Sequence, residues 1–355
     1  MGQPIVSFPG YQSYCFMPTI KEVADLAGVS VGTVSHVITG SVPVTEPLRL
    51  KVQEAILALD YHPNHVARSL KTNKTRTLGI IVPDMTVSFF PQLIRGAEAA
   101  AREQNYSLIA VNSYESADRQ KDLLSLLRSQ RVEGVLLVIS SGQTPLLQIT
   151  KMLDAGIAMV CLDRIPDRLP VDTVSVENAG AADLGMTHLI SMGYRRIALV
   201  TGPLALKNER RRLLGYQRAL ERAGIEKDER LIWPGNLRPD DIAAVCREHL
   251  SNPKTRPDAI FSTNGPTGLG VLRGIYDCGL RTPQDIGFLT FDELAVDEIF
   301  QPSITTVIQP AFEIGFRSSE ILIGRIENRM SGKRPVNVRL PAVLRVRESS
   351  RLKFK

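Results

Sequence analysis

The side chains best able to catalyse a reaction do not occur in any arrangement that a familiar catalytic mechanism requires. The chain contains no G-x-S-x-G, no H-E-x-x-H and no G-x-x-x-x-G-K-[ST] sequence. Its five histidines, at positions 36, 62, 65, 188 and 249, form no such motif, and its four cysteines include no C-x-x-C pair. We therefore expect no catalytic residue, no metal site and no cofactor, although carboxylates acting outside these motifs would escape such a search.

A different group of polar residues has the types and spacing that suit contact with a nucleic acid. His36 can donate to guanine N7 or O6, and Val31 can contact a thymine methyl group. Gly32 offers no side chain, so few base edges would be read by hydrogen bonds. The alternative interpretation is that His36 is a solvated surface histidine. Three hydroxyl groups suit phosphate oxygens, those of Ser30, Thr33 and Ser35.

These residues belong to a stretch, 19–38, that predicts two short helices joined by a tight turn. It begins with a T-x-x-E capping box, and Ser30 can cap the second helix. Gly28 lies where the turn requires a positive φ. Ala24 is small enough to let the helices approach, and Val34 can pack beneath the second helix. The pattern is typical of a helix-turn-helix, with an ordinary helical hairpin as the alternative.

A third helix and a basic connector follow. Thr45 and Pro47 can begin a helix, with the proline in the first turn where its missing N–H is tolerated. The apolar residues of this helix lie on one side: Leu48, Val52, Ala55, Ile56 and Leu59. A short helix over 63–70 would be marginal in isolation because nucleation is costly. The connector, 61–76, contains no acidic residue and four basic ones, Arg68, Lys71, Lys74 and Arg76.

The bulk composition is that of a globular protein with two or three domains. The chain has 355 residues, 43% of them hydrophobic and 23% charged. A formal net charge of +6 is compatible with a polyanionic partner but is weak evidence alone. No apolar run is long enough to span a membrane, and unpaired cysteines favour a cytoplasmic protein. Residues 1–16 lack the pattern of a secretory signal, and we expect a disordered leader or a translation start at Met17.

From Thr77 onward the pattern changes to alternating strands and helices. Runs such as TLGIIVP and IALVTG are almost continuously apolar, which is typical of parallel strands buried on both faces. The alternation occurs twice, so we expect two similar doubly wound α/β subdomains in tandem. Ligands bind such sheets outside the carboxyl ends of the strands, which predicts a binding site in the cleft between the subdomains.

The order of three helices, basic connector and strand resembles the LacI (lactose repressor)/GalR family of bacterial transcription regulators. The segments T-I-K-E-V-A, A-G-V-S, T-V-S-H-V-I and H-P-N-H-V-A-R-S-L-K carry the resemblance, which runs from about Met17 to near the C-terminus. It implies an all-α helix-turn-helix head and an α/β body of two doubly wound parallel-sheet subdomains, like a periplasmic binding protein. It also implies that the protein is a homodimeric repressor, that it binds a near-palindromic operator, and that a small metabolite controls this binding.

The resemblance assigns DNA contacts and domain bounds. Leu70 is an apolar residue between basic ones, and the matching leucine of the family wedges into the minor groove. The alternative is that Leu70 packs on the first strand of the body. The implied DNA-binding residues are Thr19, Ser30, Val31, Gly32, Thr33, Ser35, His36, Arg68, Leu70 and Lys71. The implied domains are a leader (1–16), a DNA-binding domain (17–62), a hinge helix and linker (63–76), an N-subdomain (77–177 with 309–338) and a C-subdomain (178–308 with 339–355).

The resemblance also implies which residues would bind an effector in the cleft. An arginine fork and a carboxylate suit a sugar or sugar acid. Leu206 and Leu237 are apolar where purine-binding relatives have polar or aromatic contacts, which disfavours a purine. Gly265 stands where many sugar-binding relatives have an aspartate, so one polar anchor is missing. The implied effector-binding residues are Asp84, Phe89, Phe90, Arg212, Asn264 and Asp292.

Two other classes of protein share parts of this pattern. A small-molecule carrier of the periplasmic type would have the same body, but the missing signal peptide and the helix-turn-helix oppose it. A sugar-modifying enzyme is opposed by the absence of catalytic motifs. No heptad repeat follows the last strand-like run, which favours a dimer over a tetramer.

Overall fold

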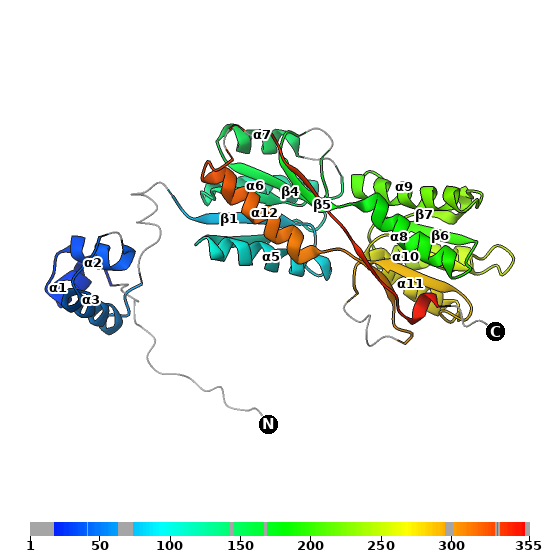
Figure 1. The fold of residues 1–355 in the computed structure, drawn as a ribbon, viewed down its shortest axis with the longest axis horizontal. Helices are drawn as coiled ribbons and strands as arrows, with labels where there is room; N and C mark the ends of the chain where they lie inside the picture. Colours follow the sequence, from blue (N-terminus) through cyan, green and yellow to red (C-terminus); the bar gives the residue numbers. More distant parts are fainter. Residues whose placement is uncertain are drawn as a thin grey trace, which may run out of the picture. The chain divides into compact units, whose positions relative to one another are not determined.

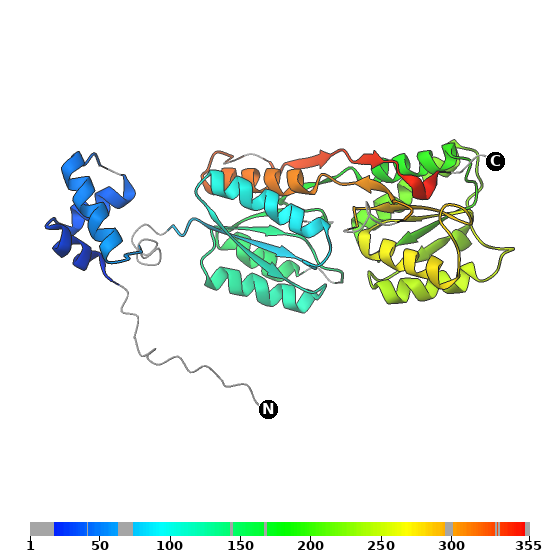
Figure 2. The same ribbon diagram turned by 90° about the horizontal axis from the view of Figure 1, so that it is seen from below.

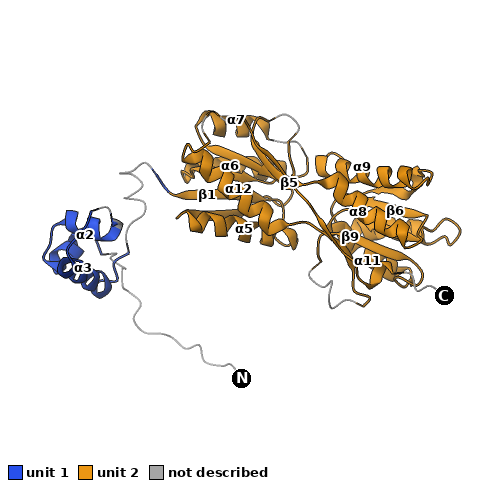
Figure 3. Ribbon diagram, viewed as in Figure 1, with its two compact units in different colours: residues 1–75 blue, residues 76–355 orange. Residues whose placement is uncertain are grey.

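The computed structural model describes residues 18–40, 42–62, 74–142, 145–166, 169–294, 301–330, 332 and 334–351. The chain divides into two compact units, residues 1–75 and 76–355, which we describe separately (Figure 3). The expected leader, 1–16, and the expected DNA contacts Arg68, Leu70 and Lys71 lie outside the described residues. Every helix in the described segments is too short or too polar to cross a lipid bilayer.

The first unit contains the three predicted helices: α1 (Ile20–Ala27), α2 (Val31–Thr39) and α3 (Glu46–Ala58). The capping box at α1 is present, since the Thr19 hydroxyl accepts from Glu22 N–H and the Glu22 carboxylate accepts from Thr19 N–H. Gly28 has the predicted positive φ, 65°, at the turn. The Ser30 hydroxyl caps α2 by accepting from Thr33 N–H at 3.1 Å. Local signals therefore fix the ends of these helices.

The core of this unit is small and lies between the three helices. The predicted apolar position Leu48 is not part of it, because its side chain is 38% exposed, and Leu26 of α1 is 56% exposed. The buried face of α1 is formed by its other apolar residues, and Leu26 points away from them. The core residues are Val23, Ala24, Ala27, Val34, Val52, Ala55 and Tyr61.

The second unit contains two six-stranded sheets (Figures 1 and 2). The first has the order β11-β5-β4-β3-β1-β2. Its strands are β1 (Thr77–Val82), β2 (Ser107–Asn112), β3 (Gly134–Leu137), β4 (Ala158–Leu162), β5 (Asp172–Val176) and β11 (Asn337–Leu340). Helices α5 (Phe89–Glu103) and α12 (Ala311–Ile326) cover one face, and α6 (Ala117–Ser129) and α7 (Leu146–Asp154) cover the other.

Two glycines allow α5 and α12 to pack closely. A Cβ atom at Gly96 would lie 1.9 Å from the Phe312 carbonyl oxygen, and one at Gly315 would lie 1.9 Å from the Leu93 carbonyl oxygen. No side chain fits at either position. This contact joins a helix from the start of the body to a helix that follows five of the six strands of the second sheet in sequence, so it returns the chain to the first subdomain.

The second sheet has the order β12-β10-β9-β8-β6-β7. Its strands are β6 (Ile197–Thr201), β7 (Ile232–Pro234), β8 (Ala259–Ser262), β9 (Gly287–Phe291), β10 (Thr305–Ile308) and β12 (Val343–Arg345). Helices α8 (Asn178–Ser191) and α9 (Lys207–Arg222) pack on one face, and α10 (Pro239–Leu250) and α11 (Gly265–Asp277) pack on the other. Short 3₁₀ helices occur at η1 (Glu229–Leu231) and η2 (Glu348–Ser350).

The chain passes between the sheets three times in the described residues: after β5, after β10 and after β11. The first sheet extends through Leu340, because β11 pairs with β5 as far as Leu340 and Val176. The third passage therefore follows Leu340, close to the bound at 338 that the family resemblance implied. Strand β12 also departs from the expected parallel arrangement, since it pairs antiparallel with β10. No crossover helix separates it from β11, so it continues in the direction of β11 (Figure 1).

Candidate functional site

A polar pocket lies where the carboxyl ends of both sets of parallel strands meet. We call it the cleft pocket, and it contains about 520 Å³ of space, part of it open to solvent. The first subdomain contributes the residues that follow β1, β2 and β4: Asp84, Val87, Phe89, Phe90, Glu115, Asp163 and Arg164. The second contributes the residues that follow β6 to β10: Asn208, Glu209, Arg212, Leu237, Asn264, Pro266, Asp292 and Gln309. This is the position that doubly wound sheets use for ligands.

Arg212 is the most completely buried cation of the cleft pocket, with 2% of its surface exposed. Its Nε donates to Asn178 Oδ1 at 2.7 Å, and Nη1 donates to the Thr263 carbonyl at 2.5 Å. Glu209 Oε1 lies 3.6 Å from Nη1. The sequence predicted a guanidinium with both donors available to a ligand, whereas only Nη2 has no hydrogen-bond partner. The other contacts fix the direction in which Nη2 points.

Unpartnered polar atoms are concentrated in this pocket. Among the described residues, nine buried side-chain nitrogen or oxygen atoms have no hydrogen-bond partner. Four of them belong to residues that line the cleft pocket: Asp163 Oδ1, Asn208 Oδ1, Arg212 Nη2 and Gln309 Oε1. An unsatisfied buried polar group costs about 1–3 kcal/mol. A ligand that supplied both donors and acceptors would remove several of these costs at once.

Asp292 lies at the end of β9 and is held by Gln309, whose Nε2 donates to Asp292 Oδ1 at 2.7 Å. Burial raises the pKa of Asp292 to about 6, although Arg212 and the bond from Gln309 oppose the shift. Burial raises the pKa of Asp163 in the same way, against the attraction of Arg164 and Arg212. Both carboxyls are therefore poorly solvated, and each would be stabilised by hydroxyl donors from a ligand.

An ion pair forms the opposite wall. Arg164 donates from Nη1 and Nη2 to the two oxygens of Glu115, at 2.9 Å and 2.8 Å. Ser141 N–H donates to the same carboxylate at 2.8 Å. Burial acts to raise the pKa of Glu115, but Arg164 and Ser141 outweigh it and lower the pKa below its usual value. Glu115 therefore stays ionised and directs Arg164 along the edge of the pocket.

The backbone around the cleft pocket adopts uncommon conformations. Four residues that line it have left-handed φ values: Glu115 (57°), Asp163 (58°), Leu237 (66°) and Asp292 (66°). None is glycine, and such residues occupy this region only when the surrounding structure holds them there. Three of the four carry carboxylates, so the unusual backbone coincides with the acidic residues of the pocket.

An apolar wall and a contact across the cleft complete the pocket. Phe89 and Phe90 pack edge to face, with ring centroids 5.2 Å apart, and both also contribute to the core of the first subdomain. Asp84 shapes the preceding loop by accepting from Thr86 N–H at 2.9 Å. Ser88 Oγ donates to the carbonyl of Glu293, which joins the two subdomains directly.

All six effector-binding residues predicted from the sequence line the cleft pocket. Asn264 also has a structural role, because its side chain caps α11 by accepting from Thr267 N–H at 3.0 Å. Its Nδ2 also donates to Glu209 Oε1 at 3.2 Å. Sequence reasoning did not identify six others: Glu115, Asp163, Arg164, Asn208, Glu209 and Gln309. The position after a predicted strand, which indicated Asp292, would also have indicated Asp163.

The first unit presents a separate polar surface at the start of α2. Val31 is 43% exposed, and Ser30, Gly32 and His36 are exposed as well. Val34, on the opposite side of the same helix, is fully buried in the core. The side chains that could read base edges therefore lie on the free face of α2, as a recognition helix requires. That these side chains contact DNA is a proposal.

A head with an exposed recognition helix and a body with a polar cleft pocket define a class of protein, the ligand-controlled DNA-binding regulators. Residues 19–64 match the family described as "Bacterial regulatory proteins, lacI family". Residues 75–347 match "Periplasmic binding proteins and sugar binding domain of LacI family". The chain therefore belongs to the LacI family of bacterial transcriptional regulators.

Relatives and solved structures agree with this assignment. The chain is 37% identical over 320 residues to the HTH-type transcriptional repressor PurR of Vibrio atlanticus, covering 90% of this chain and 95% of that protein. It is 36% identical over 310 residues to the ribose operon repressor of Escherichia coli, covering 87% and 93%. The structure of the transcriptional regulator CelR with cellobiose is 32% identical, with a TM-score of 0.71 over 94% of this chain and 99% of that one. A LacI family regulator from Enterococcus faecium with bound ribose is 28% identical, with a TM-score of 0.68 over 78% and 98%.

Proposed function

We propose that this protein is a cytoplasmic, homodimeric repressor that binds a near-palindromic operator and responds to a neutral sugar in the cleft pocket. It is a regulator and not an enzyme. The observation that carries the proposal is the set of four unpartnered buried polar atoms on residues that line the same pocket. Hydroxyl groups act as donors and acceptors, so a hydroxyl-rich ligand matches both the carboxylates and the arginines.

The charges of the cleft pocket favour a neutral sugar over a sugar acid. Its two guanidiniums, those of Arg164 and Arg212, are already engaged by protein groups. An anionic ligand would be repelled by the excess of negative charge in a poorly solvated site. The lining residues include five carboxylates: Asp84, Glu115, Asp163, Glu209 and Asp292.

The apolar lining also fits a sugar better than a purine. Phe89 and Phe90 supply an apolar face on which the C–H groups of a sugar ring can rest. Leu237 faces the pocket, and Leu206 is buried at the start of α9 outside it. A purine would find no aromatic partner at Leu237 for its second face. The cellobiose and ribose complexes of the two similar regulators support the same ligand class.

The outer face of α11 supports the proposal of a dimer. Tyr276 is 82% exposed and Leu269 is 46% exposed, and both lie on this helix. Large apolar side chains at such exposure are typical of a surface that another molecule covers. A dimer related by a twofold axis would present two heads to the two halves of a palindromic operator.

A thermal-shift screen of the full-length protein tests the ligand class. Neutral sugars should raise the melting temperature, because a ligand that binds only the folded state stabilises it. The rise should be absent from Arg212→Gln and preserved in Arg218→Gln, which changes an exposed arginine of the same helix outside the pocket. A rise caused only by sugar acids or purines, or an unchanged rise in Arg212→Gln, would contradict the proposal.

A further inference from the structure

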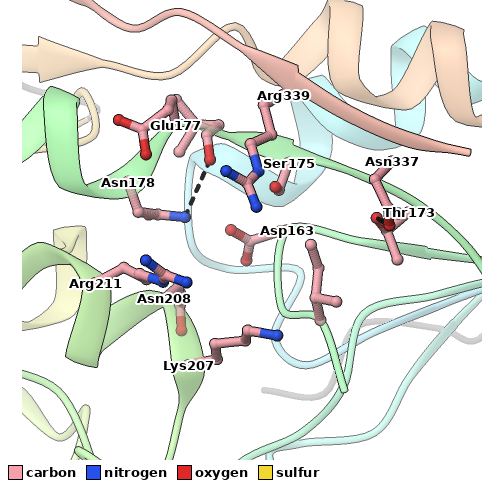
Figure 4. Close-up of a pocket in the computed structure, with 12 residues that line it drawn as sticks. Asp163, Thr173, Ser175, Glu177, Asn178, Lys207, Asn208, Arg211, Asn337 and Arg339 are labelled. Carbon is pink, nitrogen blue, oxygen red and sulfur yellow. Dashed lines mark hydrogen bonds between the residues drawn. The ribbon is translucent and has the colours of Figure 1, made fainter. Parts of the chain in front are cut away.

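A second pocket lies next to the cleft pocket, at the strands that connect the subdomains. We call it the basic pocket, and it contains about 650 Å³ of space, part of it open to solvent. It shares Asp163 and Asn208 with the cleft pocket. Its cationic side chains are Lys207, Arg211 and Arg339, and Figure 4 shows their charged ends directed toward the same space.

The cations come from both subdomains. Lys207 and Arg211 belong to the first turns of α9, whereas Arg339 belongs to β11 of the first sheet. Neither Arg211 nor Arg339 makes a hydrogen bond or ion pair with any described residue, so both guanidiniums are available. Such an arrangement brings two guanidiniums, each able to bond a phosphate with two donors, to one pocket from different subdomains.

Each of the two acidic groups that line the basic pocket has one oxygen near a protein donor. Glu177 Oε2 accepts from Gly180 N–H at 2.5 Å, which caps the start of α8. Asp163 lies with Oδ2 3.9 Å from Arg164 Nε. The residues lining the basic pocket thus include three cations and two carboxylates, whereas those lining the cleft pocket include two arginines and five carboxylates.

The start of α9 adds to the positive potential. Leu206 occupies the N-cap position and provides no side-chain hydrogen bond to the helix. The partial positive charge of a helix N-terminus favours an anion. Separate support for a ligand that also has hydroxyl donors comes from Asp163 and Asn208, which are 5% and 6% exposed. Each has a buried side-chain oxygen without a partner, and Figure 4 shows both side chains at the basic pocket.

We propose that the basic pocket binds a phosphate group, carried by a small hydroxylated molecule. The phosphate lies between Arg211 and Arg339 near the start of α9, and hydroxyl groups of the ligand donate to Asp163 and Asn208. Because the two arginines belong to different subdomains, the bound phosphate stabilises the arrangement in which they approach. Because Asp163 and Asn208 line both pockets, this ligand is thermodynamically coupled to the sugar proposed for the cleft pocket.

Calorimetric titration of the full-length protein with glycerol 3-phosphate tests the site, with inorganic phosphate as a second probe and glycerol as the uncharged control. No sugar or DNA is present, so the outcome does not depend on the proposed regulatory function. We expect glycerol 3-phosphate to bind and glycerol not to bind. Arg211→Gln and Arg339→Gln should each weaken binding by about tenfold or more, since each removes a charge-assisted pair of hydrogen bonds.

Arg218→Gln is the matched control, because it removes an exposed arginine of α9 that does not line the basic pocket. This variant should bind glycerol 3-phosphate with the same affinity as the wild type. Binding of inorganic phosphate with the same dependence on Arg211 and Arg339 would support the site with the free anion as its ligand. The proposal is overturned if neither phosphate probe produces a heat of binding or raises the melting temperature. It is also overturned if Arg211→Gln and Arg339→Gln bind glycerol 3-phosphate as tightly as the wild type does.

Discussion

The guanidinium of Arg212 lies over the ring of Phe291, with its Cζ atom 4.0 Å from the ring centroid. Phe291 is the last residue of β9, directly before Asp292. The ring supports one face of the guanidinium while Asn178 and Thr263 hold two of its nitrogens. The remaining nitrogen is thereby aimed before any ligand arrives, which reduces the ordering cost of binding.

Arg212→Lys should abolish this preorganisation while keeping the charge. An ammonium group cannot replace a planar guanidinium that stacks on a ring, bonds to protein at two nitrogens and leaves the third for a ligand. We expect sugar affinity to fall by at least about tenfold, as measured by calorimetry. Arg210→Lys serves as the control, since Arg210 is exposed and donates to the carbonyls of Leu204 and Ala205 outside the pocket. Equal sugar affinities for wild type and Arg212→Lys would show that the fork does not contact the ligand.

Asp292→Asn should stabilise the protein without ligand but impair sugar binding. Because the pKa of Asp292 rises from 3.8 to about 6 on folding, the native state holds its proton more tightly than the unfolded state between those values. The stability that protonated Asp292 contributes to the native state is therefore lost as the pH rises from about 4 to about 6. About two pKa units correspond to roughly 3 kcal/mol near neutral pH, as an upper bound.

The measurement is the melting temperature of the unliganded protein at several pH values. The variant should melt higher than the wild type near neutral pH, and the difference should shrink toward pH 4. A variant that melts lower than the wild type near neutral pH would mean that the Asp292 carboxylate stabilises the unliganded protein. That result would contradict the prediction that this carboxylate serves ligand binding at the expense of stability.

Tyr276→Glu should disrupt the proposed dimer. Burying a carboxylate at an apolar interface is costly unless it is paired. Light scattering after size-exclusion chromatography should report a monomer, and operator affinity should fall with it. Tyr114→Glu changes a tyrosine that is 64% exposed on the first subdomain and should remain a dimer. A Tyr276→Glu protein that is still dimeric would exclude the outer face of α11 as the interface.

His36→Ala should reduce operator specificity more than general DNA affinity. Loss of one base contact costs about 1–3 kcal/mol, whereas phosphate contacts elsewhere are unchanged. Fluorescence anisotropy on operator and on random duplex at the same salt concentration separates the two effects. His62→Ala, also exposed, is the control. An equal loss on both duplexes would favour the alternative that His36 is simply a solvated surface residue.

The head could be predicted closely because its signals are local. The capping box at Thr19, the turn at Gly28 and the buried Val34 are each fixed by neighbours within a few residues. The cleft pocket depends on long-range pairing. Gln309 faces the pocket only because β10 lies beside β9 and presents it to Asp292. No local pattern predicts that contact.

The roles of predicted site residues were also only partly visible in the sequence. Strand ends and family resemblance indicated Arg212 and Asn264 as effector-binding residues, and both line the cleft pocket. That Arg212 is mostly bonded to protein, and that Asn264 caps α11, follows from tertiary contacts with Asn178, Thr263 and Glu209. Residues far apart in the sequence decide how many donors remain for a ligand.

Operator affinity with and without the sugar found by the thermal-shift screen tests the central claim most directly. The DNA is the region upstream of the protein's own coding sequence, and a fragment that begins at Thr77 serves as the control without the head. We predict that the full-length protein binds this DNA and that the sugar raises or lowers its affinity for the DNA. Arg212→Lys should bind the DNA with an affinity that the sugar does not change. Operator binding by the fragment with full affinity, or an operator affinity that the bound sugar leaves unchanged, would contradict the account.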